Sequence, residues 1–270
     1  MPAIDSLDPD RIQAKLGTTR AGTDVIVYDR TASTNDIAFE YAKNPANNGL
    51  AIFAEEQTAG RGRGGNRWES TWGRSILCSV VLGESQLSCD LLSLASAVAT
   101  AEAIDATARI KWPNDVFLNG KKVAGLLLEG RTQASATTCV LGIGINCHQK
   151  YEDFGPRLQG IATSVDMELG GCCDRTALSR RLLISIDYWL DKAATDAKAV
   201  GSRWRDLSVQ LGHRISLSYN GRAFTGHCIG ADPDEGLILR LDTGGVRMFP
   251  AAQSSIVTEP AAGTTREAAS

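Results

Sequence analysis

The sequence of 270 residues lacks the features that mark membrane, secreted and disulfide-stabilised proteins. It has no run of about 18 or more apolar residues, which excludes an ordinary transmembrane helix, and its acidic start has no secretory signal pattern. Seven cysteines are present, but none are spaced as Cys-x-x-Cys, so neither a zinc site nor a redox dithiol is indicated. We therefore expect a cytoplasmic protein with reduced cysteines and no membrane partner.

A strong excess of charge is also missing. The net charge is −3 and the pI is about 5.7, which argues against a nucleic-acid partner. No Ser/His/Asp triad, histidine pair or nucleophilic cysteine is indicated by the spacing of these residue types. The few histidines are scattered and are assigned structural roles: His148, His213 and His227.

What the sequence does contain is a glycine- and arginine-rich segment at residues 60–68, Gly-Arg-Gly-Arg-Gly-Gly-Asn-Arg-Trp. Its glycines let the backbone approach a ligand closely, and the planar cations of Arg61, Arg63 and Arg67 suit phosphate or carboxylate groups. The segment has neither the end of a Walker loop nor the context of a dinucleotide fingerprint. It therefore predicts a flexible clamp for a small anion, with a solvated loop as the alternative.

Four more unusual segments accompany this loop. Residues 33–35 (Ser-Thr-Asn) precede it, and residues 111–115 (Lys-Trp-Pro-Asn-Asp), 122–129 and 142–146 (Gly-Ile-Gly-Ile-Asn) follow. In this order and spacing they resemble the biotin protein ligases, also called holocarboxylase synthetases, over about residues 28–257. The resemblance implies an enzyme that uses ATP and Mg²⁺ to convert biotin into biotinyl-5′-AMP with release of pyrophosphate. The biotin would then pass to a lysine of a biotin carboxyl carrier protein or carboxylase domain.

Residue patterns up to about position 210 predict an α+β fold, a mixed sheet with helices packed on it, as in biotin and lipoate ligases. The predicted strands cover residues 25–28, 50–55, 75–82, 109–112, 122–129 and 138–146. The predicted helices cover residues 31–42, 91–105, 176–194 and 201–207, with a short one near 11–16. Asn119-Gly120 predicts a hairpin turn.

After Leu211 the pattern changes to four short strands separated by turn sequences, at residues 215–219, 224–229, 236–241 and 246–249. This spacing predicts a small SH3-like β-barrel. We divide the chain into a polar lead (1–24), a catalytic domain that binds biotin and ATP (25–210), an SH3-like domain (211–258) and a disordered tail (259–270). The lead is too short for the helix-turn-helix domain of some family members, so we expect no DNA binding.

The resemblance assigns the catalytic roles to Lys122 and Arg63. Lys122 heads an apolar strand that would hold its ammonium group at the pocket edge, close to the biotin carboxylate and the α-phosphate of ATP. Arg63 matches the loop arginine that retains the acyl-adenylate, although Gly64 follows it where bacterial members carry another arginine. Without the resemblance, Lys122 has the pattern of a surface lysine.

The expected biotin site combines small polar side chains, glycines and cations. Hydroxyl and amide groups match the neutral ureido ring of biotin, and one unmade buried hydrogen bond costs about 1–3 kcal/mol. A helix N-cap is the alternative for residues 33–35, and both roles can hold together. Gly125 is expected to let biotin lie against bare backbone. The residues are Ser33, Thr34, Asn35, Gln57, Gly60, Arg61, Gly62, Lys122 and Gly125.

The expected nucleotide site centres on residues 111–115, where Pro113 restricts the preceding residue to an extended conformation. Asp115 is the expected Mg²⁺ ligand, because Mg²⁺ prefers oxygen, with a turn cap as the alternative. Trp68 could also be a core residue, and Asn146 is expected either to contact the adenylate ribose or to position the Lys122 strand. The nucleotide-binding residues are Arg63, Arg67, Trp68, Lys111, Asn114 and Asn146. Residues 251–257 contain no arginine, and no site residue is assigned there.

Two other functions fit parts of the pattern. A lipoate- or octanoate-type ligase or transferase would share the fold, but the glycine/arginine loop together with residues 111–115 favours biotin. A non-catalytic biotin sensor would have no need of Lys122 and the loop arginines. Neither the oligomeric state nor the identity of the acceptor carboxylase follows from the sequence.

Overall fold

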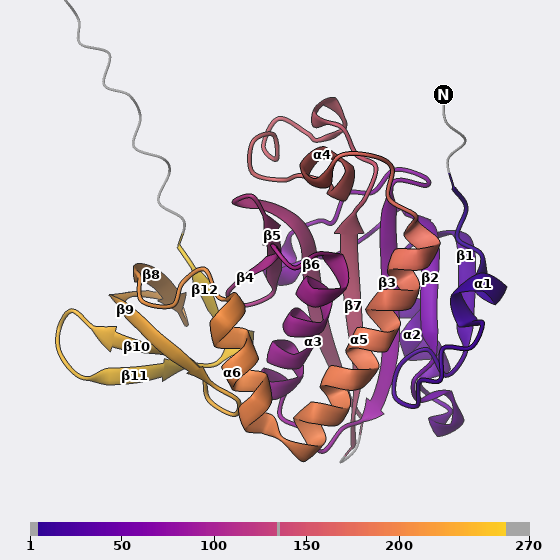
Figure 1. Cartoon of the computed structure of the whole chain (residues 1–270). Coiled ribbons are helices and arrows are strands. Elements are labelled where there is room, and N and C mark those ends of the chain that lie inside the picture. Colours follow the sequence, from indigo (N-terminus) through magenta and orange to yellow (C-terminus); the bar gives the residue numbers. More distant parts are fainter. Residues whose placement is uncertain (1–4, 134–135, 258–270) are drawn as a thin grey trace, which may run out of the picture.

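The computed structural model describes residues 5–133 and 136–257, which are arranged around two β-sheets (Figure 1). The larger sheet has seven strands in the order β1-β2-β3-β7-β6-β5-β4. Only the β1–β2 pair is parallel, and the other pairs are antiparallel. The strands are β1 (Val25–Thr31), β2 (Ala51–Gln57), β3 (Ser75–Glu84), β4 (Arg109–Lys111), β5 (Asp115–Leu118), β6 (Lys121–Gln133) and β7 (Ala136–Asn146).

Helices cover the two faces of this sheet unequally. Helices α3 (Cys89–Ile104) and α5 (Arg175–Thr195) lie on one face, and α6 (Ala197–Leu207) packs beside them toward the smaller sheet (Figure 1). Helix α2 (Thr34–Tyr41) packs on β2, β3 and β7. Successive strand residues point to opposite faces, and accordingly Phe53 joins the large core while Ile52 joins the small core under α2.

The smaller sheet follows α6 and has the order β11-β10-β9-β8-β12. Its last strand returns to pair with its first, so the C-terminal segment of the described chain closes back on this module. The strands are β8 (Arg214–Tyr219), β9 (Arg222–Asp232), β10 (Gly236–Leu241), β11 (Val246–Phe249) and β12 (Ser254–Ile256). The α+β class and the second, SH3-like sheet predicted from the sequence are therefore confirmed.

Most predicted elements occur with ends shifted by a few residues, and among the strands and α-helices three short ones are not predicted by the sequence. Strand β5, helix α4 (Val165–Leu169) and β12 are five residues or fewer in length, too short for periodicity to show. Asn119 and Gly120 form the predicted hairpin, both with positive φ. The domain boundaries remain predictions, and the predicted tail at 259–270 lies outside the described residues.

The N-terminal lead is fastened to the sheet by buried charge. Arg175, which is fully buried at the start of α5, binds Glu55 of β2 (Nη1–Oε2 2.7 Å) and Asp5 of the lead (Nε–Oδ1 2.7 Å). Burial alone would raise the pKa of Asp5, but hydrogen bonds from His148 and Arg175 hold it well below its ordinary value. Helix α1 (Pro9–Gln13) follows this anchor. None of the helices in the described ranges is long and apolar enough to cross a membrane.

Candidate active site

A cavity of about 910 Å³ opens beside strands β6 and β7 and the glycine/arginine loop. This volume is at the upper end of the range for small-molecule sites, which suits two ligands better than one. All of the site residues predicted from the sequence line the cavity except Gly60 and Asn146. Residues 252–256, which include strand β12 of the smaller sheet, also form part of the lining.

One side of the cavity, which we call the neutral wall, consists of Ser33, Thr34, Asn35 and Gln57. Thr34 donates from both its backbone N–H (2.7 Å) and its hydroxyl (3.0 Å) to Gln57 Oε1. Ser33 occupies the N-cap position of α2, but its side chain makes no capping hydrogen bond. The Ser33 side chain therefore does not cap α2. It is buried and lines the cavity.

A residue that the sequence did not single out holds this wall together. Ser79 of β3 is fully buried, and its hydroxyl lies 2.7 Å from Thr34 Oγ1 and 2.5 Å from Asn35 Oδ1. The Asn35 amide in turn donates to Glu129 Oε2 at 2.6 Å. The glycine at position 142 makes room for this arrangement, since a Cβ there would lie 2.4 Å from Asn35 Oδ1. The neutral wall is thus pre-organised by buried partners.

Two glycines form the floor of the cavity. Gly125 of β6 and Gly144 of β7 are cross-strand partners, and the Trp68 ring lies on them. A Cβ on Gly144 would come within 2.4 Å of the indole, and one on Gly125 within 3.0 Å. Trp68 therefore occupies the bare backbone that was expected to receive biotin. Its indole Nε1 is buried against Gly144 and has no hydrogen-bond partner among the described residues.

The opposite side, which we call the charged wall, consists of Lys111, Asp115, Lys122 and Arg63. Lys122 Nζ forms an ion pair with Asp115 Oδ1 at 2.6 Å, and both side chains are partly exposed. Lys122 Nζ also lies 5.8 Å from the centre of the Trp68 ring. Lys111 lies over the Phe117 ring at 5.4 Å. The wall holds more cations than carboxylates, as a site for phosphate requires.

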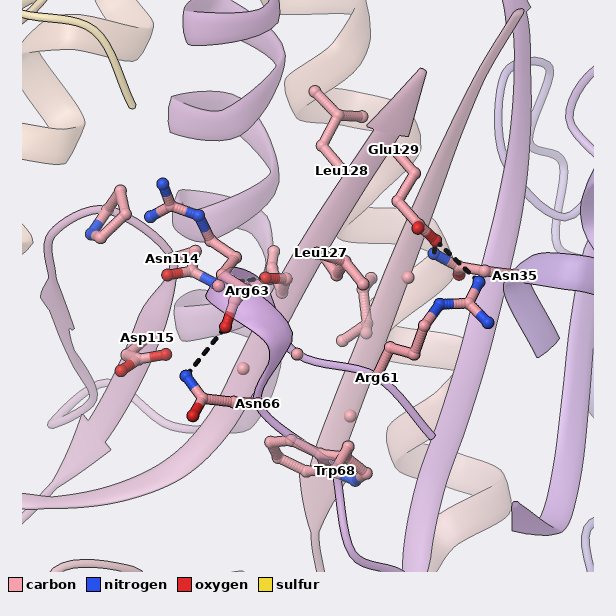
Figure 2. A pocket seen from close by; sticks show the side chains of 18 of the residues that line it. Asn35, Arg61, Arg63, Asn66, Trp68, Asn114, Asp115, Leu127, Leu128 and Glu129 are labelled. Carbon is pink, nitrogen blue, oxygen red and sulfur yellow. Dashed lines mark hydrogen bonds and ion pairs between the residues drawn. The ribbon is translucent and has the colours of Figure 1, made fainter. Parts of the chain in front are cut away.

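The two principal loop arginines point to opposite ends of the cavity (Figure 2). Arg61 binds Asp36 of α2 (Nη1–Oδ2 2.7 Å) and Glu129 of β6 (Nη2–Oε2 3.2 Å). The hydrogen bond from Arg61 lowers the pKa of Asp36, against the effect of burial. Arg63 instead reaches the smaller sheet, where it donates to the carbonyls of Ala251 and Ser254.

The charge of Arg63 is partly buried. Burial lowers the pKa of its guanidinium group, and the negative charges of Asp115 and Asp90 oppose this shift. Burial likewise raises the pKa of Asp90, which accepts a hydrogen bond from the Ala251 N–H at 2.5 Å. Ala251 is therefore held from two sides, by an acid of α3 and by an arginine of the loop.

Residues 111–115 form the link between the cavity and the C-terminal sheet. The Trp112 N–H donates to Gln210 Oε1 at 3.1 Å, and its indole Nε1 donates to Ser254 Oγ at 3.0 Å. The Trp112–Pro113 peptide bond is cis. The Asn114 amide donates to the Leu126 carbonyl, which ties this turn to β6. Arg67 donates to the Thr58 carbonyl at 2.9 Å and so helps to close the loop.

Gly60 and Asn146, the two predicted site residues that do not line the cavity, contact the segments that form it. A Cβ on Gly60 would lie 2.6 Å from the Trp68 carbonyl oxygen, and Gly60 accepts from the Trp68 N–H at 3.0 Å, so it closes the loop at its base. Asn146 donates to the Thr163 carbonyl at 3.0 Å, and the Thr163 N–H donates to the Lys122 carbonyl at 2.8 Å. Of its two expected roles, these bonds favour the positioning of the Lys122 strand, through Thr163.

The sequence reading also missed residues that complete the site. Asp36 and Glu129 balance Arg61, and no local sequence signal links them to it, because they lie 25 and 68 residues away along the chain. The sequence also gave no indication of the C-terminal part of the lining, because that segment contains no arginine. This part consists of Ala252, Gln253, Ser254, Ser255 and Ile256.

Comparison with known proteins identifies the class to which this fold and cavity belong. The model of the Biotin/lipoate A/B protein ligase family matches residues 27–146. The chain is 32% identical over 254 residues to the bifunctional ligase/repressor BirA of Bacillus spizizenii, spanning 91% of this chain and 78% of that protein. It is also 32% identical to the biotin--[acetyl-CoA-carboxylase] ligase of Mycobacterium tuberculosis, spanning 81% of this chain and 83% of that protein.

The fold agrees with these sequence relationships. The structure resembles the biotin protein ligase from Aquifex aeolicus in complex with biotin and ATP, with a TM-score of 0.75 and 25% identity over 88% of this chain and 100% of that one. The chain is thus a ligase, and it belongs to the biotin protein ligase family.

Proposed function

We propose that this protein activates biotin with ATP as biotinyl-5′-AMP and transfers the biotin to a lysine of a biotin carboxyl carrier domain. The observation that carries the proposal is a single cavity with a neutral wall and a charged wall, large enough for an acyl-adenylate. Relatives named as biotin ligases support biotin over lipoate or octanoate as the acid. The structural relative solved with biotin and ATP supports the pair of small substrates.

The neutral wall is suited to the ureido ring of biotin, which has two N–H donors and one carbonyl and bears no charge. The buried Ser33 hydroxyl lines the cavity and can accept or donate. Thr34 and Asn35 already have protein partners, so their contribution is to fix the shape of the wall. An acid without a ureido ring would leave buried polar groups unpaired, at about 1–3 kcal/mol each.

Adenylation takes place at the charged wall. A carboxylate oxygen of biotin attacks the α-phosphorus of ATP, the bond to the bridging oxygen breaks, and pyrophosphate leaves. Lys122 neutralises the two approaching anions and the charge that develops on the α-phosphate. Its backbone is fixed by β6 and by hydrogen bonds to Ile161 and Thr163, so its ammonium group needs little reorganisation.

The charged wall also fits Mg²⁺. Asp115 is the carboxylate at this end of the lining, and Mg²⁺ is usually held by one or two carboxylates together with substrate phosphates. Asp115 would therefore hold the ion together with the phosphates of ATP. When bound, the ion supplies positive charge to the triphosphate. Asp115 is paired with Lys122 at 2.6 Å, so the same carboxylate also sets the position of the catalytic lysine.

The second step transfers the acyl group. The unprotonated amine of the acceptor lysine attacks the acyl carbonyl carbon, an amide bond forms, and AMP leaves with the electron pair of the broken C–O bond. Before this step the mixed anhydride must be kept from water. Residues 61–68 of the loop line the cavity. The contacts of Arg61 anchor the loop at one end of the cavity and those of Arg63 anchor it at the other, which suits the loop to retain the intermediate (Figure 2).

The test is a transfer assay with the full chain, biotin, MgATP and an unmodified biotin carboxyl carrier domain. Intact-mass spectrometry should show a gain of one biotinyl group on the carrier that depends on ATP, and chromatography should show AMP and pyrophosphate. Lys122→Ala should abolish most of the gain, whereas Lys121→Ala is the matched control, because Lys121 pairs with Glu168. A carrier that gains mass from octanoate or lipoate and none from biotin would contradict the proposal.

A further inference from the structure

A second group of potential ligand atoms lies outside the active-site cavity. His148 follows β7, Asp166 lies in α4, and Cys172 follows that helix. One ring nitrogen of His148, a carboxylate oxygen of Asp166 and the sulfur of Cys172 all lie within 4.8 Å of one another. Their spacing along the sequence matches no zinc motif, and it is the path of the loop around α4 that brings them together.

We propose that His148, Asp166 and Cys172 form a zinc-binding site. Imidazole nitrogen, carboxylate oxygen and thiolate sulfur are the three ligand types that Zn²⁺ uses in proteins, and three protein ligands leave a fourth position for water. Mg²⁺ and Ca²⁺ are disfavoured because they prefer sites made of oxygen. Cys172 is exposed, so an ion can enter from solvent without unfolding of the chain.

The surroundings of His148 support this assignment. Nδ1 lies 2.7 Å from Asp166 Oδ2, while Nε2 lies 3.2 Å from Asp5 Oδ1. With its proton on Nε2, the ring donates to Asp5 and turns the Nδ1 lone pair toward the other two ligands. Asp5 is itself held by Arg175 (Nε–Oδ1 2.7 Å). A carboxylate that orients a metal-binding histidine in this way is common to zinc sites.

The second oxygen of Asp166 is fixed as well. Asp166 Oδ1 accepts from the Cys173 N–H at 2.7 Å, and the Asp166 N–H donates to the Cys147 carbonyl at 3.0 Å. The Cys173 N–H thus fixes one carboxylate oxygen, and the bond to Cys147 fixes the backbone of Asp166. A bound ion would fasten α4 and its flanking loops to the N-terminal lead through Asp5. These flanking loops contain Ile161 and Thr163, which hold the Lys122 backbone.

The experiment measures metal binding by the reduced full-length chain and does not depend on ligase activity. Zinc affinity is obtained by competition with a chromogenic chelator, and Co²⁺ is added as a spectroscopic probe. We expect one Zn²⁺ per chain and a thiolate-to-Co²⁺ charge-transfer absorption. Cys172→Ser should remove this absorption and weaken zinc binding by tenfold or more, and Asp5→Asn should weaken it by about 10–100-fold.

Cys89→Ser is the matched control, because Cys89 is also an exposed cysteine but lies at the start of α3. It should leave the absorption and the affinity unchanged. The proposal is overturned if the wild-type chain gives no thiolate absorption with Co²⁺, or if Cys172→Ser binds zinc as tightly as the wild type. An absorption that survives Cys172→Ser and disappears in Cys89→Ser would show adventitious binding at an exposed thiol.

Discussion

The two walls of the cavity are built by different physical means. The neutral wall is a chain of hydrogen bonds that runs from the partly buried Gln57 through the buried side chains of Thr34 and Ser79 to Asn35. The charged wall consists of partly exposed ions, of which Lys122 and Asp115 pair with each other. Buried hydrogen bonds fix a shape at little electrostatic cost. Exposed ions keep their charge available for a substrate and are easily rearranged.

The difference matches what each half of the proposed reaction needs. Recognition of a neutral ring requires a rigid pattern of donors and acceptors, whereas adenylation requires cations that can follow developing charge. The glycine/arginine loop joins the two, since Arg61 is anchored near the neutral wall and Arg63 near the charged wall (Figure 2). Changes on one wall should therefore act on biotin affinity, and changes on the other wall on the rate of adenylation.

The largest effect is expected from Lys122→Ala. Removal of the cation that faces both anions should slow formation of biotinyl-AMP by about 10²–10³-fold, the usual loss for one preorganised electrostatic contact. Biotin binding should change far less, because the neutral wall is intact. The measurement is biotin-dependent exchange of pyrophosphate into ATP, with equilibrium binding of biotin measured in parallel. Equal losses in both would show that the walls do not act separately.

The next effect concerns a residue that does not line the cavity. Ser79→Ala removes the hydroxyl that holds Asn35 Oδ1 and Thr34 Oγ1, and leaves a buried acceptor unpaired at about 1–3 kcal/mol. We expect the KM for biotin to rise about tenfold while the KM for ATP and the adenylation rate at saturating biotin stay close to wild type. A fall in the saturated rate with no change in the KM for biotin would contradict this positioning role.

Ser79 also illustrates what the sequence does and does not reveal. The motif residues Asn35 and Lys122 could be predicted because their types, order and spacing together are unusual. A serine inside an apolar strand is common, and only the packing of α2 on β3 shows what it holds. The partner of Arg63 is a backbone carbonyl 188 residues further along the chain, and a carbonyl has no sequence signature. The folded chain alone brings such pairs together.

The helices and strands also divide into those that the sequence predicts and those that only tertiary pairing defines. Helix α3 and strand β3 were predictable because each is long and apolar enough for its period to show. Strand β12 has three residues and is defined by its pairing with β8. Likewise, Gly144 belongs to a motif that the sequence shows, but its role as the floor beneath Trp68 depends on the cross-strand pairing with Gly125.

A smaller effect is expected where the loop meets the charged wall. Arg63→Gly removes the hydrogen bonds to Ala251 and Ser254 that anchor the loop to the C-terminal sheet. We expect biotinyl-AMP to dissociate severalfold to about tenfold faster, which corresponds to about 0.5–1.5 kcal/mol, the usual net contribution of one hydrogen bond. Labelling of an unrelated protein added in excess would report the released intermediate. Retention equal to wild type would show that the loop is held closed without Arg63.

The smallest effect is expected from Arg61→Ala, at the other anchor of the same loop. Arg61 pairs with Asp36 and Glu129, but its side chain is 37% exposed, so solvent and salt screen these interactions. Asn35 also holds Glu129, which should keep the carboxylate in place. The KM for biotin should therefore rise less than about threefold, and the difference from wild type should shrink as salt is added, because exposed ion pairs weaken with ionic strength. A larger, salt-independent rise would mean that Arg61 contacts biotin directly, and the neutral wall would then extend into the loop.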